Sequence, residues 1–202
     1  MLSLYILKNI EKMKKIILFA SGNGSNVQQI TEYFAQNKDV EISYLFCNKS
    51  NAYVLERAKN LHIPSMIIDR TSFYETEEVL QKIATICPDL IVLAGFLWLM
   101  PKNIVEAYPQ KIINIHPALL PKFGGKGMYG HHVHEAVFAA KETVTGITIH
   151  YVNSQYDQGD IIFQAKCNIS PKDNPDDIAT KIHLLEKEHF PRVISEILFN
   201  EK

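Results

Sequence analysis

The chain has 202 residues, of which 47% are hydrophobic and 21% are charged, and its formal net charge is −1. These proportions are ordinary for a globular protein that buries a sizeable core. A charge so close to zero offers no field that would attract nucleic acid or a membrane surface, and no apolar run reaches the ~18 residues that a membrane-spanning helix needs. We therefore expect neither nucleic acid nor a membrane as a partner. The chain is expected to be a monomer or a homodimer.

The chain has three cysteines, Cys47, Cys87 and Cys167, and each lies in or beside an apolar run. An odd number of widely spaced cysteines does not suggest a disulfide framework. The sequence therefore predicts reduced, buried thiols and a cytoplasmic protein.

The first residues differ in character from the rest. Residues 1–12 carry scattered lysines and no small-residue cleavage site, so they make a poor signal peptide. Met13 is followed by two lysines and a long apolar run, as in a genuine start. We expect residues 1–12 to be a dispensable extension and residues 13–202 to form a single domain.

Apolar periodicity predicts alternating strands and helices. The expected strands are 16–20, 41–47, 65–68, 90–94, 112–116, 143–152 and 161–167. The expected helices are 27–35, 51–60, 72–86, 101–107, 131–140 and one that starts with Asn174 as N-cap and is kinked or interrupted at Pro191. The alternation predicts a Rossmann-like α/β fold, with a mostly parallel twisted sheet, helices on both faces and an antiparallel hairpin near the end.

The first strand ends in the glycine-containing turn 21–26 (SGNGSN), which leads into a helix. A strand, a glycine-rich turn and a helix together offer backbone N–H groups and a helix N-terminus to a phosphate. The glycine spacing is not that of a dinucleotide-binding fingerprint, because Asn26 stands near the place of the last glycine. The turn therefore indicates an anion site, or alternatively a simple N-cap.

Two polar side chains follow the apolar start of the strand at 112–116. Asn114 and His116 are two positions apart, so they point to the same face of the strand, and Pro117 and Pro121 end regular structure after them. Ligands of open parallel α/β sheets bind outside the carboxyl ends of the strands. An amide donor and a proton carrier at that edge indicate acyl chemistry.

Several other segments are candidates for the same site. The apolar loop 96–100 (FLWLM) would form the wall of a pocket for a flat ring system, or would lie under the core. The loop from Gly124 to Gly130 is rich in glycine, as in loops that close over a ligand. The connection 153–160 carries two acids, Asp157 and Asp160, and the residues alone do not decide which of them is catalytic.

His131, His132 and His134 open the helix at 131–140 and raise the question of a metal. Adjacent histidines point apart on a helix, and no carboxylate or cysteine completes a ligand set. We therefore expect no metal.

Two stretches, 114–121 (NIHPALLP) and 156–160 (YDQGD), resemble the folate-dependent formyltransferases. With the turn 21–26, the resemblance extends from about Lys14 to the end of the chain and is strongest to the members that act on glycinamide ribonucleotide. It implies transfer of the formyl group of 10-formyltetrahydrofolate to the amine of that ribonucleotide in purine biosynthesis, without a metal. The loop from Gly124 to Gly130 is longer than in common members, and Trp98 stands where an arginine is frequent.

The resemblance also implies roles for single residues. It makes the catalytic residues Asn114, His116 and Asp157. It places the phosphate and ribose of the acceptor on Gly22, Asn23, Gly24, Ser25 and Glu186. It places the folate among Phe96, Leu97, Trp98, Leu99, Asn114, His150 and Asn153.

Those residues suit a direct transfer through a tetrahedral intermediate. Asn114 and a protonated His116 would stabilise the oxyanion, and Asp157 would carry the proton. Formyltransferases that act on initiator tRNA carry an extra domain, and formyltetrahydrofolate hydrolases carry a regulatory one, so both are expected to be excluded. A sugar-nucleotide formyltransferase and a non-catalytic nucleotide-binding module remain as alternatives.

Overall fold

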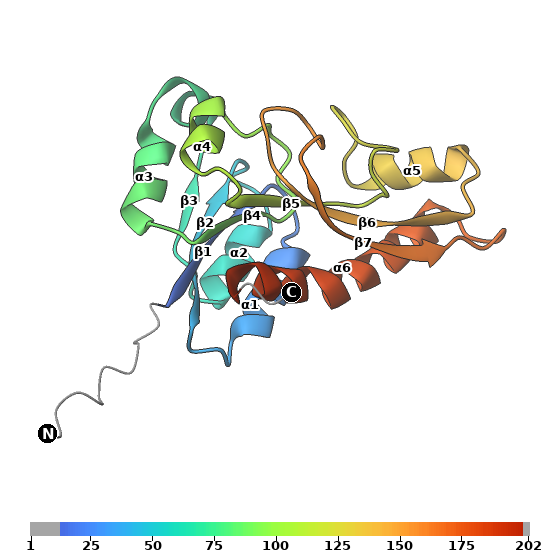
Figure 1. Cartoon of the computed structure of the whole chain (residues 1–202), viewed down its shortest axis with the longest axis horizontal. Helices are drawn as coiled ribbons and strands as arrows, with labels where there is room; N and C mark the ends of the chain where they lie inside the picture. The colour runs from blue at the N-terminus through green and yellow to red at the C-terminus, as the bar shows by residue number, and fades with distance from the viewer. Residues whose placement is uncertain (1–12, 200–202) are drawn as a thin grey trace, which may run out of the picture.

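The computed structural model describes residues 13–199, so the expected extension at 1–12 lies outside the described residues (Figure 1). Seven strands form one sheet in the order β3-β2-β1-β4-β5-β6-β7. Their bounds are β1 Lys14–Ala20, β2 Val40–Cys47, β3 Ser65–Ile67, β4 Leu90–Leu93, β5 Ile112–His116, β6 Val144–Tyr151 and β7 Ile161–Asn168. The first five strands are parallel, and β6 and β7 pair antiparallel, as the sequence predicted.

Helices cover both faces of this sheet (Figure 1). Their bounds are α1 Ser25–Phe34, α2 Val54–Asn60, α3 Glu78–Ile86, α4 Lys102–Ala107, α5 His131–Ala139 and α6 Pro175–Phe199. Side chains of α1, α2, α5 and α6 share one hydrophobic core, and those of α3 and α4 share the other. Within the described residues, no helix has both the length and the apolar character of a membrane span.

The period-two alternation of the strands divides their side chains between the two cores. On β5, Ile113 and Ile115 belong to the core of α1, α2, α5 and α6, whereas Ile112 belongs to the core of α3 and α4. Asn114 and His116 have the same parity as Ile112. Both polar side chains therefore lie on the face of α3 and α4, at the carboxyl end of the strand.

The direction in which strands are added reverses between β1 and β4. Strands β2 and β3 lie on one side of β1, and β4 and the later strands lie on its other side. Such a switch point leaves a crevice outside the carboxyl ends of the two strands. The loops on its two sides are joined, because Ser21 N donates to Gly95 O at 3.1 Å and Leu97 N donates to Ser21 Oγ at 2.9 Å. The glycine-containing turn and the apolar loop 96–100 are thereby held at the same edge.

Three expectations about local structure were wrong. The predicted helix 72–86 is a single wide turn, Thr71–Glu75, followed by α3, because Thr76 is extended and its hydroxyl accepts Glu78 N at 3.3 Å. The interruption expected at Pro191 is absent, since helix α6 is continuous from Pro175 to Phe199 and Pro191 is one of its buried residues. All three thiols are free, but Cys47 alone is buried; Cys87 is exposed and Cys167 half-buried.

The close approach of β6 and β7 at Gly146 gives a test of the hairpin. A Cβ atom on this residue would lie 1.9 Å from Ala165 O, a backbone atom that cannot move independently of β7. We expect Gly146→Ala to lower the free energy of unfolding by about 1–3 kcal/mol or more, as measured by urea denaturation. Gly22→Ala is the control, because a Cβ there meets nothing within 4 Å; equal stability of the two variants would contradict the pairing.

Candidate active site

A cavity of about 600 Å³ opens at the carboxyl ends of β1, β4 and β5. The glycine-containing turn, the apolar loop, the end of β5, the glycine-rich loop and the 155–157 segment all line it. Among the predicted site residues, its lining includes Gly22, Asn23, Gly24, Ser25, Phe96, Leu97, Trp98, Leu99, Asn114, His116, His150, Asp157 and Glu186. The structure thus brings together every predicted site residue except Asn153.

At one end of the cavity, the turn 21–26 has the geometry of an anion site. Gly24 is in the left-handed region at φ 80°, and a Cβ atom there would lie 2.4 Å from Val54 Cγ2, so only glycine fits. No side chain caps α1, and its first residues, Ser25 and Asn26, line the cavity at the positive end of the helix dipole. Arg57 holds the turn in place, because its side chain donates to Asn23 O at 2.9 Å and to Asn23 Oδ1 at 2.8 Å.

An aromatic wall occupies another side of the cavity. Trp98 lies 5.8 Å from Phe73, 5.9 Å from Tyr74 and 6.2 Å from Phe96, measured between ring centroids. The Arg70 guanidinium lies 5.0 Å from the centre of the Trp98 ring. Phe96 and Met100 belong to the core, as one interpretation of the loop 96–100 expected. The loop also lines the cavity, and binding of a flat ring system there stays a prediction.

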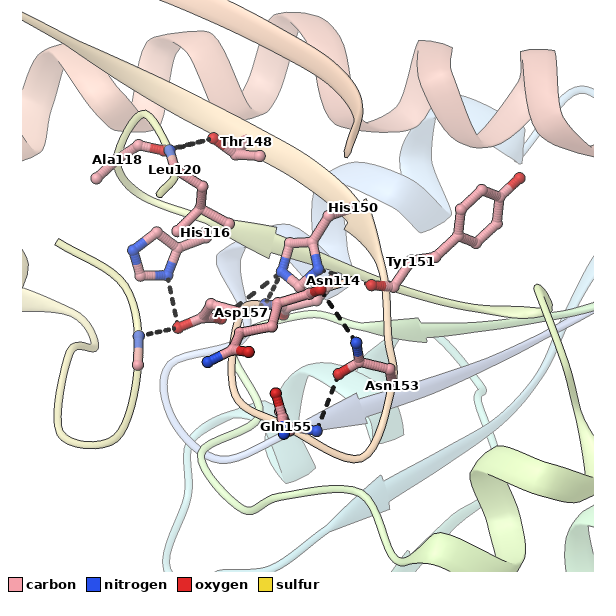
Figure 2. A network of polar contacts seen from close by, with 12 residues as sticks. Asn114, His116, Ala118, Leu120, Thr148, His150, Tyr151, Asn153, Gln155 and Asp157 are labelled. Carbon is pink, nitrogen blue, oxygen red and sulfur yellow. Dashed lines mark hydrogen bonds and ion pairs between the residues drawn. The ribbon is translucent and has the colours of Figure 1, made fainter. Parts of the chain in front are cut away.

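The amide of Asn114 is oriented by two neighbours (Figure 2). Asn114 lies directly opposite His150 in the pairing of β5 with β6, and its Nδ2 is 3.1 Å from His150 Nε2. His150 Nδ1 is 2.8 Å from Tyr151 O, which can only accept, so Nδ1 carries a proton. His150 Nε2 faces the Asn114 amide and, at 3.6 Å, Asp157 Oδ1. The second N–H of the amide points toward Asp157 Oδ1 over a long 3.5 Å, so it is free to turn to a substrate oxygen.

His116 and Asp157 face each other across the same space (Figure 2). His116 Nε2 lies 2.8 Å from Phe123 O and must donate to it, which leaves Nδ1 as the acceptor of the neutral ring. This Nδ1 is 3.6 Å from Asp157 Oδ2. Two acceptors in this position form a site that takes up one proton.

The electrostatics of this pair agree with its geometry. Burial lowers the pKa of His116 below its ordinary 6.5 and outweighs the opposing effect of the Asp157 charge. Burial raises the pKa of Asp157, but contacts with His150 and His116 and the Gly125 N–H outweigh it and hold that pKa below its ordinary value. These directions favour a neutral imidazole beside an ionised carboxylate in the protein without substrate, and the protonated His116 expected during the reaction stays a prediction.

Asp157 is fixed by the loop that follows β5. Gly125 N donates to Asp157 Oδ2 at 2.8 Å. Gly124 lies so close that a Cβ atom there would be 2.5 Å from Leu120 Cδ2 and 3.3 Å from Asp157 Cβ. Asp157 itself has φ 55°, a left-handed conformation that aspartate and asparagine tolerate better than most residues.

Two residues that the sequence reasoning missed hold the proline-containing loop after His116. Thr148 is fully buried, donates to Ala118 O at 2.7 Å and accepts Leu120 N at 3.0 Å. Gln164 Nε2 donates to Leu120 O at 3.1 Å and to Thr148 Oγ1 at 2.9 Å. The sequence contains little sign of these roles, because Thr and Gln in a strand also occur commonly at the protein surface.

Glu186 lies on α6 at the end of the cavity near the turn 21–26. It is 7% exposed, accepts from Asn26 Nδ2 at 3.2 Å and lies 3.1 Å from His183 Nδ1. The hydrogen bond to Glu186 raises the pKa of His183. His134 on α5 is 3% exposed, its Nδ1 has no partner among the described residues, and burial, with His183 next in effect, lowers its pKa to about 4.

The remaining candidates lie differently from expectation or carry no ligand geometry. Asn153 does not line the cavity; its side chain bridges Gln158 O at 3.0 Å and Gln155 N at 2.9 Å and so shapes the loop that carries Asp157. Asp160 is exposed and serves the turn through its backbone. Within residues 13–199, no three His, Cys, Asp or Glu side chains are placed to hold a metal ion.

The turn 21–26, here called the anion turn, and the cluster of Asn114, His116 and Asp157 share one cavity at the edge of a Rossmann-like sheet. This arrangement is typical of an enzyme that transfers an acyl group to a phosphorylated substrate. The sequence matches the family described as "Formyl transferase" over residues 14–194. The chain belongs to the formyl transferase family.

Relatives and solved structures agree with this assignment. The chain is 39% identical to the phosphoribosylglycinamide formyltransferase of Bacillus subtilis (strain 168), over 92% of this chain and 95% of that protein. It is 34% identical to the protein of the same name from Escherichia coli (strain K12), over 89% and 85%. It also resembles the crystal structure of the phosphoribosylglycinamide formyltransferase from Streptococcus pneumoniae TIGR4, with a TM-score of 0.81 and 35% identity over 92% of this chain and 99% of that chain.

The buried His134 predicts a loss of stability in acid. A folded-state pKa of about 4, below the ordinary 6.5, means that the unfolded chain binds this proton more tightly, so stability is lost as the pH falls from 6.5 toward 4. Replacement by a neutral side chain in His134→Gln should remove up to about 3 kcal/mol of that pH dependence, as measured by denaturation at pH 7 and 4.5. The exposed His132→Gln is the control, and an unchanged pH dependence in His134→Gln would contradict the assignment.

Proposed function

We propose that this chain transfers the formyl group of 10-formyltetrahydrofolate to the amine of glycinamide ribonucleotide, a step of purine biosynthesis. Membership of the formyl transferase family and relatives named for this reaction support it. The observation that carries the proposal is the convergence of Asn114, His116 and Asp157 in one cavity with the anion turn.

In this proposal the acceptor lies between α1 and α6. Its phosphate binds the backbone of Gly22, Asn23, Gly24 and Ser25 at the N-terminus of α1, where the dipole favours an anion. Glu186 accepts hydrogen bonds from the ribose or glycinamide portion, and the bond from Asn26 holds its carboxylate in position. The amine then points toward the end of β5.

The folate donor lies along the aromatic wall. Phe96, Leu97, Trp98 and Leu99 offer an apolar surface to the pteridine, and this surface continues to Asn114. Asn153 contributes indirectly, through the shape of the loop that brings Asp157 to the formyl group. Binding both substrates in one cavity replaces a bimolecular encounter with a positioned one.

The chemistry is a direct transfer. The amine nitrogen attacks the formyl carbon, and a C–N bond forms as the carbonyl pair moves to oxygen. An N–H of Asn114 turns from Asp157 to the developing oxyanion, while His150 keeps the amide oriented. His116 Nδ1 and Asp157 receive the proton that the attacking nitrogen loses and return it to the folate nitrogen as its bond to carbon breaks.

The proposal extends to the organisation and location of the protein. Residues 13–202 act as one catalytic domain, for which residues 1–12 are dispensable. A cytoplasmic location is supported by three free thiols, one of them exposed. The chain acts as a monomer or a homodimer.

The experiment is an assay with both substrates. The protein should release tetrahydrofolate from 10-formyltetrahydrofolate only when glycinamide ribonucleotide is present, followed by absorbance and by the mass of the formylated product. Release without the acceptor would indicate a hydrolase, and no release with either a nucleotide or a sugar-nucleotide acceptor would indicate a binding module.

His116 and Asp157 give the sharpest test of the mechanism. His116→Ala and Asp157→Asn should lower kcat by about 100- to 10,000-fold, the range for a lost general acid or base. Acceptor binding should be largely retained, because neither residue lies at the anion turn. Asp160→Asn is the matched control on the same loop, and unchanged turnover in Asp157→Asn would refute the role of the carboxylate.

The same pair predicts a pH profile. Because Nδ1 of His116 must be free to accept the proton, kcat/KM should fall in acid with a midpoint below 6.5. Asp157→Asn removes a charge that raises the pKa of His116, so the residual activity should fall at still lower pH. A midpoint that moves upward in this variant would contradict the assignment.

The aromatic wall predicts a selective effect on the donor. A charge placed by Leu99→Asp should raise KM for the folate at least about 10-fold, since it leaves a carboxylate in an apolar contact, and should leave KM for the ribonucleotide within about twofold. Trp98 is the one tryptophan of the chain, so quenching of its fluorescence reports folate binding directly. Equal effects on both substrates would place the folate elsewhere.

A further inference from the structure

The connection from β2 to α2 places a lysine on the wall of the cavity. This lysine has no role in the site described above. Lys49 lines the cavity together with Gly22, Gly24 and Asn26, and it is exposed. No ion pair formed within residues 13–199 includes its ammonium group. It is therefore a cation free to bind a ligand beside the anion turn.

Backbone contacts fix Lys49 relative to this turn. Lys49 O accepts from Cys47 Sγ at 3.3 Å and from Ala52 N at 3.2 Å, so the start of the connection is a tight turn. At its other end, Val54 N donates to Gly22 O at 3.1 Å, and the Val54 side chain packs against Gly24. The connection is thus docked on the two glycines that form the anion site.

The charges around the cavity favour Lys49 as the cation for this site, since His183, which also lines the cavity, is already paired with Glu186 at 3.1 Å. Asp157 and Glu186 contribute carboxylates to the lining, and Glu186 lies at the same end as the turn. Arg57 is the nearby guanidinium, but Asn23 and Gln28 already occupy it and it does not line the cavity. Lys126, the other lysine in the lining, lies on the glycine-rich loop between two glycines of positive φ, with no contact that fixes it to the turn.

We propose that the Lys49 ammonium binds the phosphate of the acceptor, opposite the backbone N–H groups of the turn. The inference rests on the proposed function, whose acceptor is a phosphate ester. A phosphate dianion near Glu186 is repelled by that carboxylate, and Lys49 offsets the repulsion with a charge-assisted hydrogen bond. Lys49 thereby selects a phosphorylated acceptor over the same molecule without its phosphate.

The test combines a change in the protein with a change in the substrate. Kinetics are measured with glycinamide ribonucleotide and with the glycinamide riboside, which lacks the phosphate, for the wild type, Lys49→Ala and Lys49→Arg. Lys49→Ala should raise KM for the ribonucleotide about 10- to 100-fold, as for a lost hydrogen bond between charged groups, with kcat changed less than about threefold. Its kcat/KM for the riboside should equal that of the wild type, and Lys49→Arg should restore part of the loss.

Lys59→Ala is the matched control, because Lys59 is exposed on α2 and does not line the cavity. An equal loss with both acceptors would show a structural role and overturn the inference, as would an unchanged KM. A loss specific to the phosphate in Lys126→Ala but not in Lys49→Ala would assign the cation to the glycine-rich loop instead.

A binding experiment separates this inference from the proposed function. Inorganic phosphate is titrated into the wild type and Lys49→Ala by calorimetry, with no formyl donor present. Weaker binding in Lys49→Ala supports the inference even if the wild type formylates neither acceptor, an outcome that would refute the proposed function alone. Equal phosphate affinity in the two proteins overturns the inference whatever the activity.

Discussion

The pairing of β5 with the antiparallel strand β6 is the constraint on which the candidate site depends. Its register sets Asn114 opposite His150 and His116 opposite Thr148. The first pair orients the amide, and the second holds the loop that follows the imidazole. The chain then turns from the end of β6 into the loop that carries Asp157. The Asp157 carboxylate therefore lies 3.6 Å from His116 Nδ1 and 3.6 Å from His150 Nε2. A slip by one residue would move every one of these side chains to the other face of the sheet.

Burial gives the cluster its chemical character. A neutral His116 beside an ionised Asp157 is the state that water exclusion and the surrounding contacts favour in the free protein. In this state the pair has room for one proton, which is what an attacking amine must lose. The same polar groups would be poor choices for a merely stable core, because burial of ionisable groups costs free energy that an apolar side chain would not cost. The arrangement is therefore explained by function better than by folding.

Much of this could be predicted from the sequence, because the relevant signals are local. Alternating apolar runs predicted the sheet, its parallel part and the terminal hairpin, and the parity of Asn114 and His116 predicted their common face. The predicted helix 72–86 is divided at Thr76, whose hydroxyl accepts a hydrogen bond from Glu78 N. The spacing of apolar residues carries no information about such a side-chain contact. The continuity of α6 through Pro191 could not be predicted, because the local rule for proline takes no account of the buried residues beside it, such as Phe190 and Val193. Lys49, Thr148 and Gln164 escaped notice because their roles arise only when distant segments meet.

Helix α6 connects the site to the completion of the fold. It supplies Glu186 to the cavity and, in the same turns, Ile182, Phe190 and Ile194 to the larger core. Because α6 carries both Glu186 and a large share of this core, the wall of the cavity is complete only once α6 has packed. Packing of the larger core and completion of the cavity wall are therefore one step of folding, and a change that loosens α6 in the core also displaces Glu186.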